Sequence, residues 1–294
     1  MKYFLLLFLL GCASLTYAQL TPLKGAGANK IEEPVGDATP EMIEDEYLRV
    51  AKKCGLTIGY TLSGVTAIVL SPEETKPFLP RFFAAMDIFP VRFLRATRLH
   101  TVIFCRDLKS NGFPAAGLAV SDGRIYLDVT HFNSKTIYHE MFHIADNLRH
   151  NESWTKLNSK QFAYGGSKFK PVELDKKSKT KAEAVKSDAE IRKDFVSDYA
   201  MTSEVEDRAE TFAWMVANPK QFEAMTKESP VLEKKAQIVK KIVREFAPAM
   251  NKDFWDFIAD SDDASRMEDF MKRAKINDQL KKDKKALLNS GYTK

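Results

Sequence analysis

The chain has 294 residues, of which 44% are hydrophobic and 29% are charged. That composition is ordinary for a globular protein and excludes collagen-like, coiled-coil and fully disordered chains. The formal net charge of +5 is too small to indicate nucleic acid or a lipid surface as the partner. The length fits either one large domain or two lobes that share a cleft.

The first residues, "MKYFLLLFLLGCASLTYAQL", contain one lysine, a short apolar run and then small residues. This pattern is typical of a secretory signal peptide, and the apolar run is too short to remain as a membrane span. Two cleavage sites compete. Signal peptidase would remove residues 1–18, whereas the lipobox-like "LLGC" would leave a lipid anchor at Cys12; we favour the first site because the second implies a very short signal. We therefore expect an exported protein, secreted or held in the periplasm or cell envelope.

Residues 19–44 are rich in Pro, Gly and Glu without an apolar period, which predicts a flexible leader. One domain is then expected over 45–294, beginning with a short helix in "EYLRVAKKCG". Its sheet lobe, about 45–150, contains the strand-like runs "TAIVLS" and "HTVIFCR", with a proline-opened helix "PFLPRFFAAMDIF" between them. "GLAVSDGRIYLDV" alternates on both sides of Asp122-Gly123, which predicts a hairpin.

The two cysteines of the mature chain are Cys54 and Cys105. An exported protein meets an oxidising compartment, so a disulfide between them is one expectation, and two buried free thiols are the other. Neither cysteine has the spacing of a zinc-ligand pair with the other.

A helix is predicted for "NSKTIYHEMFHIADNL", with Asn133 or Ser134 as its N-cap. At about 100° per residue, His139 and His143 lie about 40° apart on one face. The opposite face carries the apolar residues of the segment, namely Ile137, Met141, Ile144 and Leu148. The apolar face and the histidine face therefore do not compete.

The H-E-x-x-H spacing points to zinc, because one helical turn brings two imidazoles together and zinc accepts imidazole nitrogen at about 2.0–2.1 Å. Glu140, after the first histidine, can reach an attacking water as general base without ligating the metal. The third ligand must come from elsewhere. The pattern "H-E-x-x-H-x-x-G-x-x-H" is absent, since Asp146 and Arg149 stand at its glycine and last histidine, and this excludes a metzincin.

"DYAMTSEVEDRAETFAWMV" offers a glutamate on a second helix that begins at Ser203. Its predicted apolar face consists of Val205, Ala209, Phe212 and Val216. Glu206 and Glu210 lie about 40° apart at the edge of that face, and two such carboxylates call for a cation. Glu206 would bind the metal, and Glu210 would accept the N–H of a ligand histidine. Alternatively, Ser203-x-x-Glu206 is a capping box.

"HEMFHIAD" followed by "YAMTSEVEDRAETFA" resembles the gluzincin metallopeptidases, in particular the anthrax lethal-factor-like proteases and related zinc metallopeptidases of exported bacterial proteins. The resemblance covers about Ala116–Met215. It implies an α+β, zincin-like fold, in which a small mixed sheet lobe carries the active-site helix and a mainly helical lobe, about 195–294, follows. It also implies one zinc ion and roles for individual residues: His139, His143 and Glu206 as ligands, Glu140 as catalytic base, Tyr199 assisting catalysis and Glu210 as a second acidic residue.

The sequence departs from that family by a lysine-rich insertion, about 165–193, which is expected to be a solvated surface segment or a mobile flap. Asp146 shares the face of the histidines. It either supports a histidine from the second shell or is a surface aspartate.

The resemblance implies a zinc metalloendopeptidase that hydrolyses peptide or protein substrates, and the signal-like first residues predict its export. The small net charge argues against a nucleic-acid partner, and the short apolar run argues against a transmembrane span. By analogy, the strand "RIYLDV" would pair with extended substrate. Two alternatives stay open. One is a catalytically inactive zincin-fold protein that binds zinc or a partner in the envelope, and the other is a structural envelope protein without metal.

Overall fold

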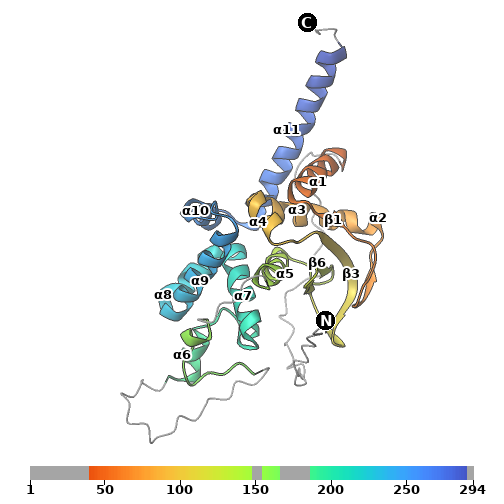
Figure 1. Cartoon of the computed structure of the whole chain (residues 1–294). Helices are drawn as coiled ribbons and strands as arrows, with labels where there is room; N and C mark the ends of the chain where they lie inside the picture. Colours follow the sequence, from red (N-terminus) through yellow and green to blue (C-terminus); the bar gives the residue numbers. More distant parts are fainter. Residues whose placement is uncertain (1–39, 148–153, 166–185, 290–294) are drawn as a thin grey trace, which may run out of the picture.

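The computed structural model of the chain describes residues 40–147, 154–165 and 186–289 (Figure 1). It confirms the α+β fold, since a small mixed sheet is followed by a mainly helical region. The predicted signal peptide, Cys12 and nearly all of the predicted leader lie outside the described residues, as does most of the lysine-rich insertion. No helix in the described ranges is both long and apolar enough to span a membrane.

The strands are β1 (Thr57–Ile58), β2 (Thr66–Val69), β3 (Thr101–Ser110), β4 (Phe113–Pro114), β5 (Gly117–Val120) and β6 (Arg124–Asp128). The α-helices are α1 (Pro40–Cys54), α2 (Pro72–Thr75), α3 (Leu79–Asp87), α4 (Val91–Ala96), α5 (Ser134–Asp146), α6 (Asp188–Arg192), α7 (Glu204–Ala217), α8 (Pro219–Glu228), α9 (Pro230–Phe246), α10 (Lys252–Asp260) and α11 (Asp263–Asn289). Three short 3-10 helices complete the list, namely η1 (Lys76–Phe78), η2 (Thr155–Leu157) and η3 (Tyr199–Met201).

The sheet runs in the order β1-β3-β6-β5, with β2 and β4 also paired to β3. β1, β3 and β6 are parallel, and β5 returns antiparallel to β6. The predicted hairpin is therefore confirmed. Its turn contains Gly123 at φ 98°, a left-handed conformation that glycine adopts without strain. The outer strand on this side of the sheet is β5, and the described edge of the sheet nearest α5 belongs to it.

The side chains of β3 alternate between two cores. Phe104 packs in the main core, between the sheet and the helices, and Cys105 packs in a small cluster on the opposite face. Cys54, at the end of α1, belongs to the main core, so the two thiols lie on opposite faces of the sheet. Both are buried free thiols, so the expected disulfide is wrong and the alternative expectation is confirmed. Burial raises the pKa of Cys54 to about 11 and that of Cys105 to about 12, so both stay protonated thiols.

α1 begins at Pro40, earlier than the predicted start near Glu46, because proline suits the first turn of a helix and the acidic residues that follow favour it. α3 is confirmed, although a 3-10 turn containing Pro77 precedes it. The mainly helical lobe expected over about 195–294 is also confirmed, because the chain there consists largely of α7, α8, α9, α10 and α11.

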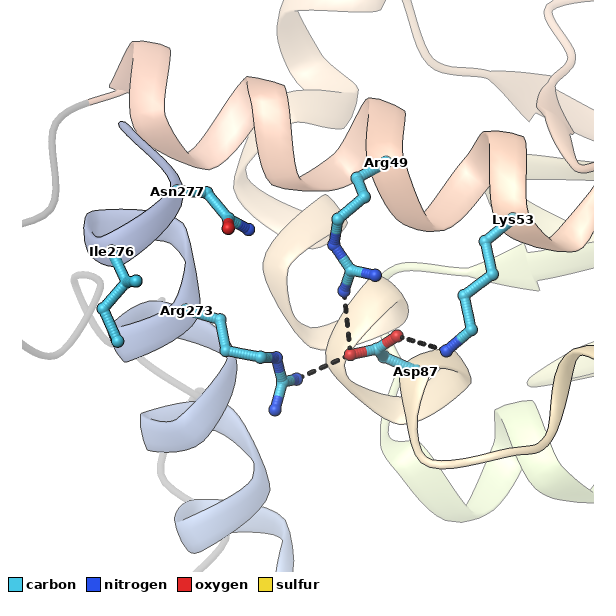
Figure 2. A pocket seen from close by; sticks show the side chains of 6 residues that line it. All are labelled: Arg49, Lys53, Asp87, Arg273, Ile276 and Asn277. Atoms are coloured by element: carbon cyan, nitrogen blue, oxygen red, sulfur yellow. Dashed lines mark hydrogen bonds and ion pairs between the residues drawn. The ribbon is translucent and has the colours of Figure 1, made fainter. Parts of the chain in front are cut away.

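Charged side chains fasten α11 to α1 and α3 (Figure 2). Asp87 at the end of α3 accepts hydrogen bonds from Arg49 at 3.1 Å, Lys53 at 2.9 Å and Arg273 at 2.6 Å. Buried Glu46 accepts two more from Arg49. These five residues are hereafter called the α11 joint. All of them except Glu46 line an open cavity, and none of the predicted site residues lines it. Its carboxylates are compensated by neighbouring cations, which marks it as a structural contact.

α5 lies between the sheet and α7 (Figure 1). Asn133 is its N-cap and accepts the backbone N–H of Thr136 at 2.9 Å. Ile137, Met141 and Ile144 are buried as predicted, and the face with the histidines is largely buried too, because α7 covers it. Leu148 lies outside the described residues.

α7 starts at the predicted N-cap, Ser203. Ala209, Phe212 and Val216 form its buried face, and Phe212 stacks on Phe142 of α5 with ring centroids 4.8 Å apart. Val205 was predicted to join this face but is 38% exposed, because burial of the helix becomes continuous only after its first turn.

Candidate metal centre

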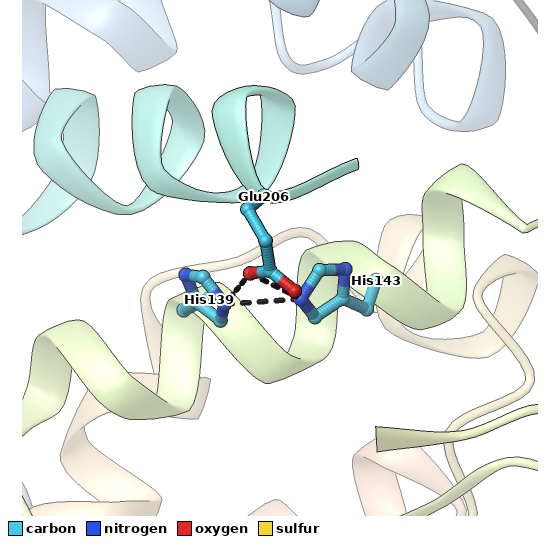
Figure 3. A group of neighbouring side chains, drawn as sticks. All are labelled: His139, His143 and Glu206. Carbon is cyan, nitrogen blue, oxygen red and sulfur yellow. Dashed lines mark hydrogen bonds and ion pairs between the residues drawn. The ribbon is translucent and has the colours of Figure 1, made fainter. Parts of the chain in front are cut away.

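Three side chains from two helices converge between α5 and α7 (Figure 3). Oε2 of Glu206 lies 3.0 Å from Nε2 of His139 and 3.3 Å from Nε2 of His143. The two Nε2 atoms are 3.0 Å apart. The structure thus brings together the three side chains that the sequence proposed as ligands, and within the described residues no second group of this kind occurs.

These distances fit a single metal ion. A tetrahedral zinc site with bonds of about 2.0–2.1 Å separates its ligand atoms by about 3.3 Å. The three observed separations, 3.0 to 3.3 Å, are close to that value. In addition, Oε2 of Glu206 is buried without a well-formed hydrogen bond from the described residues. Two imidazole nitrogens and one carboxylate oxygen form a donor set that suits zinc, so the residues present fit the ion.

Glu210 orients His139. Its Oε1 lies 3.0 Å from Nδ1 of His139, while its Oε2 accepts hydrogen bonds from Ser197 Oγ at 2.8 Å and Lys135 Nζ at 3.2 Å. A proton on Nδ1, donated to Glu210, leaves the Nε2 lone pair free for a metal. This is the contact that the sequence proposed for Glu210. Ser197 and Lys135 had escaped notice, because nothing in their local sequence marks them.

The electrostatics of the cluster favour a cation. Burial opposes a charge on His139, but Glu206 and Glu210 outweigh it and raise its pKa to about 10. Burial also disfavours the two carboxylates, yet the histidines hold the pKa of Glu206 well below its usual range, and His139 with Lys135 lowers that of Glu210 to about 2. The ionised carboxylates of Glu206 and Glu210 therefore flank a protonated His139. A metal ion can take the place of that proton.

The capping alternative for Glu206 holds only in part. Ser203 Oγ accepts the backbone N–H of Glu206 at 3.2 Å, so Ser203 caps α7. The carboxylate of Glu206, however, lies against the histidines rather than on the backbone N–H of Ser203. Complete capping boxes do occur elsewhere in the chain, at Ser71 with Glu74 and at Ser187 with Glu190, where the glutamate folds back.

Glu140 is buried beside the ligand cluster, and β5 holds it in place. It is 6% exposed and accepts the backbone N–H of Ala119. A Cβ added at Gly117 would lie 2.6–2.9 Å from three atoms of the Glu140 side chain, so only glycine leaves room there. Burial raises the pKa of Glu140, although the nearby histidines lower it. Gly117 could not be predicted from the sequence, because its contact with Glu140 joins a strand to a helix.

The predicted substrate strand "RIYLDV" requires a correction. β6, which contains it, is bonded to β3 on one side and to β5 on the other over their shared length. Its backbone groups are therefore already paired, and the edge beside the site belongs to β5.

Tyr199 lies at the open side of the cluster, in η3. Its ring centroid is 5.9 Å from that of His139, and its hydroxyl bonds to Glu206. The residue is 51% exposed, but the burial of its hydroxyl end and the neighbouring carboxylates Glu206 and Glu140 raise its pKa above the ordinary value. Tyr199 therefore keeps its proton at neutral pH and can donate a hydrogen bond.

Asp146 is neither a surface aspartate nor the partner of a histidine, contrary to both sequence-based expectations. It is 3% exposed, and its two carboxylate oxygens accept hydrogen bonds from Nε of Arg208 at 3.0 and 2.8 Å. The reason is that Arg208 reaches across from α7 and occupies the carboxylate.

A second buried ion pair fixes α7 from its other side. Asp207 is fully buried and accepts hydrogen bonds from Lys235 of α9 at 2.7 Å, Trp154 at 3.0 Å and Tyr164 at 2.6 Å. Two aromatic side chains of the segment before the insertion, Trp154 and Tyr164, therefore pack against α7. The polar part of this network joins three segments, namely residues 154–165, α7 and α9, and could not be predicted from the sequence.

Comparison with known proteins agrees with this geometry at the level of family. A family model described as "Putative zinc-binding metallo-peptidase" matches residues 119–252. That span contains the three proposed ligands and their neighbours, from His139 to Glu210. Neither the curated proteins nor the solved structures include a match to the chain. The match does not reach the narrower gluzincin or lethal-factor-like groups, so that resemblance stays a prediction.

Proposed function

We propose that this protein is an exported zinc metalloendopeptidase, which cleaves peptide bonds within peptide or protein substrates. One observation carries the proposal. Two imidazole nitrogens and a buried carboxylate oxygen without a well-formed hydrogen bond lie within 3.3 Å of one another, beside the buried carboxylate of Glu140. The family match over the same residues supports zinc as the metal and peptide bonds as the target.

His139, His143 and Glu206 would hold the ion, with Glu210 fixing the ring of His139. When bound, zinc supplies Lewis acidity that polarises the scissile carbonyl and lowers the pKa of water. The protein must then move protons. Glu140, whose pKa burial raises, takes one proton from the attacking water and delivers it to the amide nitrogen as the C–N bond breaks. Because its pKa is raised towards neutral pH, the carboxylate of Glu140 can both accept and release the proton efficiently.

Tyr199 would stabilise the transition state of the reaction. Negative charge develops on the carbonyl oxygen as water attacks, and a neutral phenol can donate a hydrogen bond to it. The hydroxyl that now bonds to Glu206 would turn to the substrate. None of the described strands pairs with the outer side of β5. The Ala119 N–H there bonds to Glu140, and the other backbone groups of this edge would pair with an extended substrate.

Export is a separate part of the proposal and rests on the first residues of the sequence, a lysine followed by an apolar run and small residues. Cleavage after residue 18 would give a secreted or periplasmic protein, and lipidation of Cys12 would anchor it in the cell envelope. Mass spectrometry of the N-terminus of protein recovered from the producing cell distinguishes these outcomes, and an uncleaved N-terminus contradicts export by either route.

The catalytic claim is tested by Glu140→Gln. This change removes the base but none of the proposed ligands, so we expect zinc to stay bound at one ion per chain while cleavage of a broad peptide library is lost. Glu223→Gln, an exposed glutamate of α8, is the matched control and should cleave normally. Full peptidase activity in Glu140→Gln contradicts the mechanism. Stoichiometric zinc without cleavage by the unaltered protein supports the inactive, zinc-binding alternative instead.

A further inference from the structure

The metal centre is assembled from two helices that are far apart in the sequence and run antiparallel. Glu210 contacts His139, while the earlier Glu206 contacts both His139 and the later His143. All three of these cross-helix contacts are made by the proposed ligands and Glu210. A further polar link between α5 and α7 involves neither, and it joins Asp146 to Arg208.

This link is buried and bidentate. Nε of Arg208 donates to both oxygens of Asp146, at 3.0 and 2.8 Å, and a terminal nitrogen lies 2.8 Å from Oδ2. Arg208 is 6% exposed and Asp146 is 3% exposed. The remaining terminal nitrogen of Arg208 binds Glu204, in the first turn of α7. A planar guanidinium that meets a carboxylate edge to edge fixes both distance and orientation, which a flexible lysine would not.

The link also lies close to the ligands along each helix. Asp146 follows His143 by one turn of α5, on the same face, and Arg208 follows Glu206 by two residues in α7. Over such short spans a helix moves as a rigid body, so a change in the distance between Asp146 and Arg208 changes the distance between His143 and Glu206.

We infer that Asp146 and Arg208 are positioning residues, a clamp that sets the separation of the two halves of the metal centre. The inference rests on the proposed function only in its metal-binding part, and it does not depend on catalysis. Three ligands bind one ion tightly only when their atoms are held within about 0.5 Å of the productive positions. The clamp supplies that constraint from outside the cluster, whereas the buried Asp207–Lys235 pair ties α7 to α9 and leaves its distance from α5 free.

The test compares zinc affinity with stability in a set of variants. Asp146→Asn and Arg208→Gln each break the clamp, and the double variant removes both charged groups. Arg208→Lys keeps the positive charge but loses the planar guanidinium. Glu46→Gln is the matched control, because Glu46 is also a buried carboxylate bound by an arginine, but in the α11 joint. Zinc dissociation constants are measured by competition with a chelator, at a temperature where each zinc-free variant is folded by circular dichroism.

Each clamp variant should bind zinc roughly 10-fold more weakly, the lower end of what loss of an outer-shell partner costs. The double variant should lose no more than the worse single variant, because the two residues act as one unit. The visible spectrum of the cobalt-substituted protein should change in the clamp variants and not in Glu46→Gln, which should lower thermal stability but keep zinc affinity within about twofold.

Clamp variants that lose thermal stability but keep the zinc affinity and cobalt spectrum of the unaltered protein would show a purely structural pair and overturn the inference. If Asp146→Asn does not fold, the zinc affinity of Arg208→Lys tests the inference instead, because in that variant Asp146 still faces a cation. The two proposals fail differently. An unaltered protein that binds zinc but cleaves nothing contradicts the peptidase, while the comparison of zinc affinities stands; an unaltered protein that binds no zinc contradicts both.

Discussion

Two clusters of buried charge in this protein are built from similar groups and have opposite character. In the α11 joint, Asp87 meets three cations and Glu46 is bonded to Arg49 and to Asn277, so the carboxylates are compensated. In the metal centre, an oxygen of Glu206 has no well-formed hydrogen bond and two imidazole nitrogens face each other at 3.0 Å. Compensated charge fastens helices together. Buried polar groups that lie close together but lack hydrogen-bond partners mark a place where a ligand is expected.

The largest expected effect is on zinc affinity, and it is tested by one substitution in each cluster. Glu206→Gln should weaken zinc binding by more than about 100-fold, because loss of a ligand costs more than loss of an outer-shell partner. Asp87→Asn, the equivalent change in the α11 joint, should leave zinc binding unchanged. Chelator competition measures both. Equal zinc affinity in Glu206→Gln and the unaltered protein would place the metal elsewhere.

The next prediction concerns Gly117, which faces Glu140. Gly117→Ala forces the Glu140 side chain to move, since the new methyl group would otherwise lie within 3.0 Å of it. A misplacement of about 1 Å is expected to lower peptidase kcat by roughly 100-fold, with zinc still bound. Gly165→Ala is the control, because a Cβ there meets nothing within 4 Å. Unchanged kcat in Gly117→Ala would mean that Glu140 does not act from this position.

The pH dependence of zinc binding sharpens the comparison further. His139 has a pKa of about 10 without metal, so zinc must displace a proton from it at neutral pH. Raising the pH makes that displacement easier, and zinc affinity should rise by about tenfold per pH unit between pH 6 and 8. Competition with a chelator of known protonation behaviour measures the slope. An affinity independent of pH over that interval would show that no proton is released.

The smallest effect is expected in the α11 joint. Asp87→Asn should lower the free energy of unfolding by only about 1–2 kcal/mol, because the three partner cations are 28% to 44% exposed and partly screened by water. Denaturant unfolding measures the loss, and peptidase activity serves as the control. Loss of activity that matches the loss of stability would contradict the separation of the two clusters.

Much of the site could be predicted from local sequence. The 3.6-residue repeat placed His139 and His143 on one face of α5, and the same repeat set Glu206 and Glu210 side by side on α7. Helix caps at Asn133 and Ser203 were also visible, since capping depends on residues within one turn. These features share one property, which is that their partners lie on the same helix.

Contacts between segments were hidden. The prediction put Asp146 on the histidine face of α5, which is correct. Its partner, Arg208, projects about 200° from Glu206 around α7 and reaches Asp146 only because the arginine side chain is long. The predicted disulfide is wrong for a similar reason, since nothing in the local sequence shows that Cys54 and Cys105 pack on opposite faces of the sheet. Gly117 shows the same limit, because a close approach between a strand and a helix leaves no periodic trace.

The central claim is that His139, His143 and Glu206 bind one zinc ion, and anomalous diffraction at the zinc edge tests it most directly. We predict a single strong peak within about 2.2 Å of Nε2 of both histidines and of a Glu206 carboxylate oxygen, the reach of zinc ligands. A crystal grown with stoichiometric zinc that shows no peak between α5 and α7, or a peak bound by other residues, would contradict it.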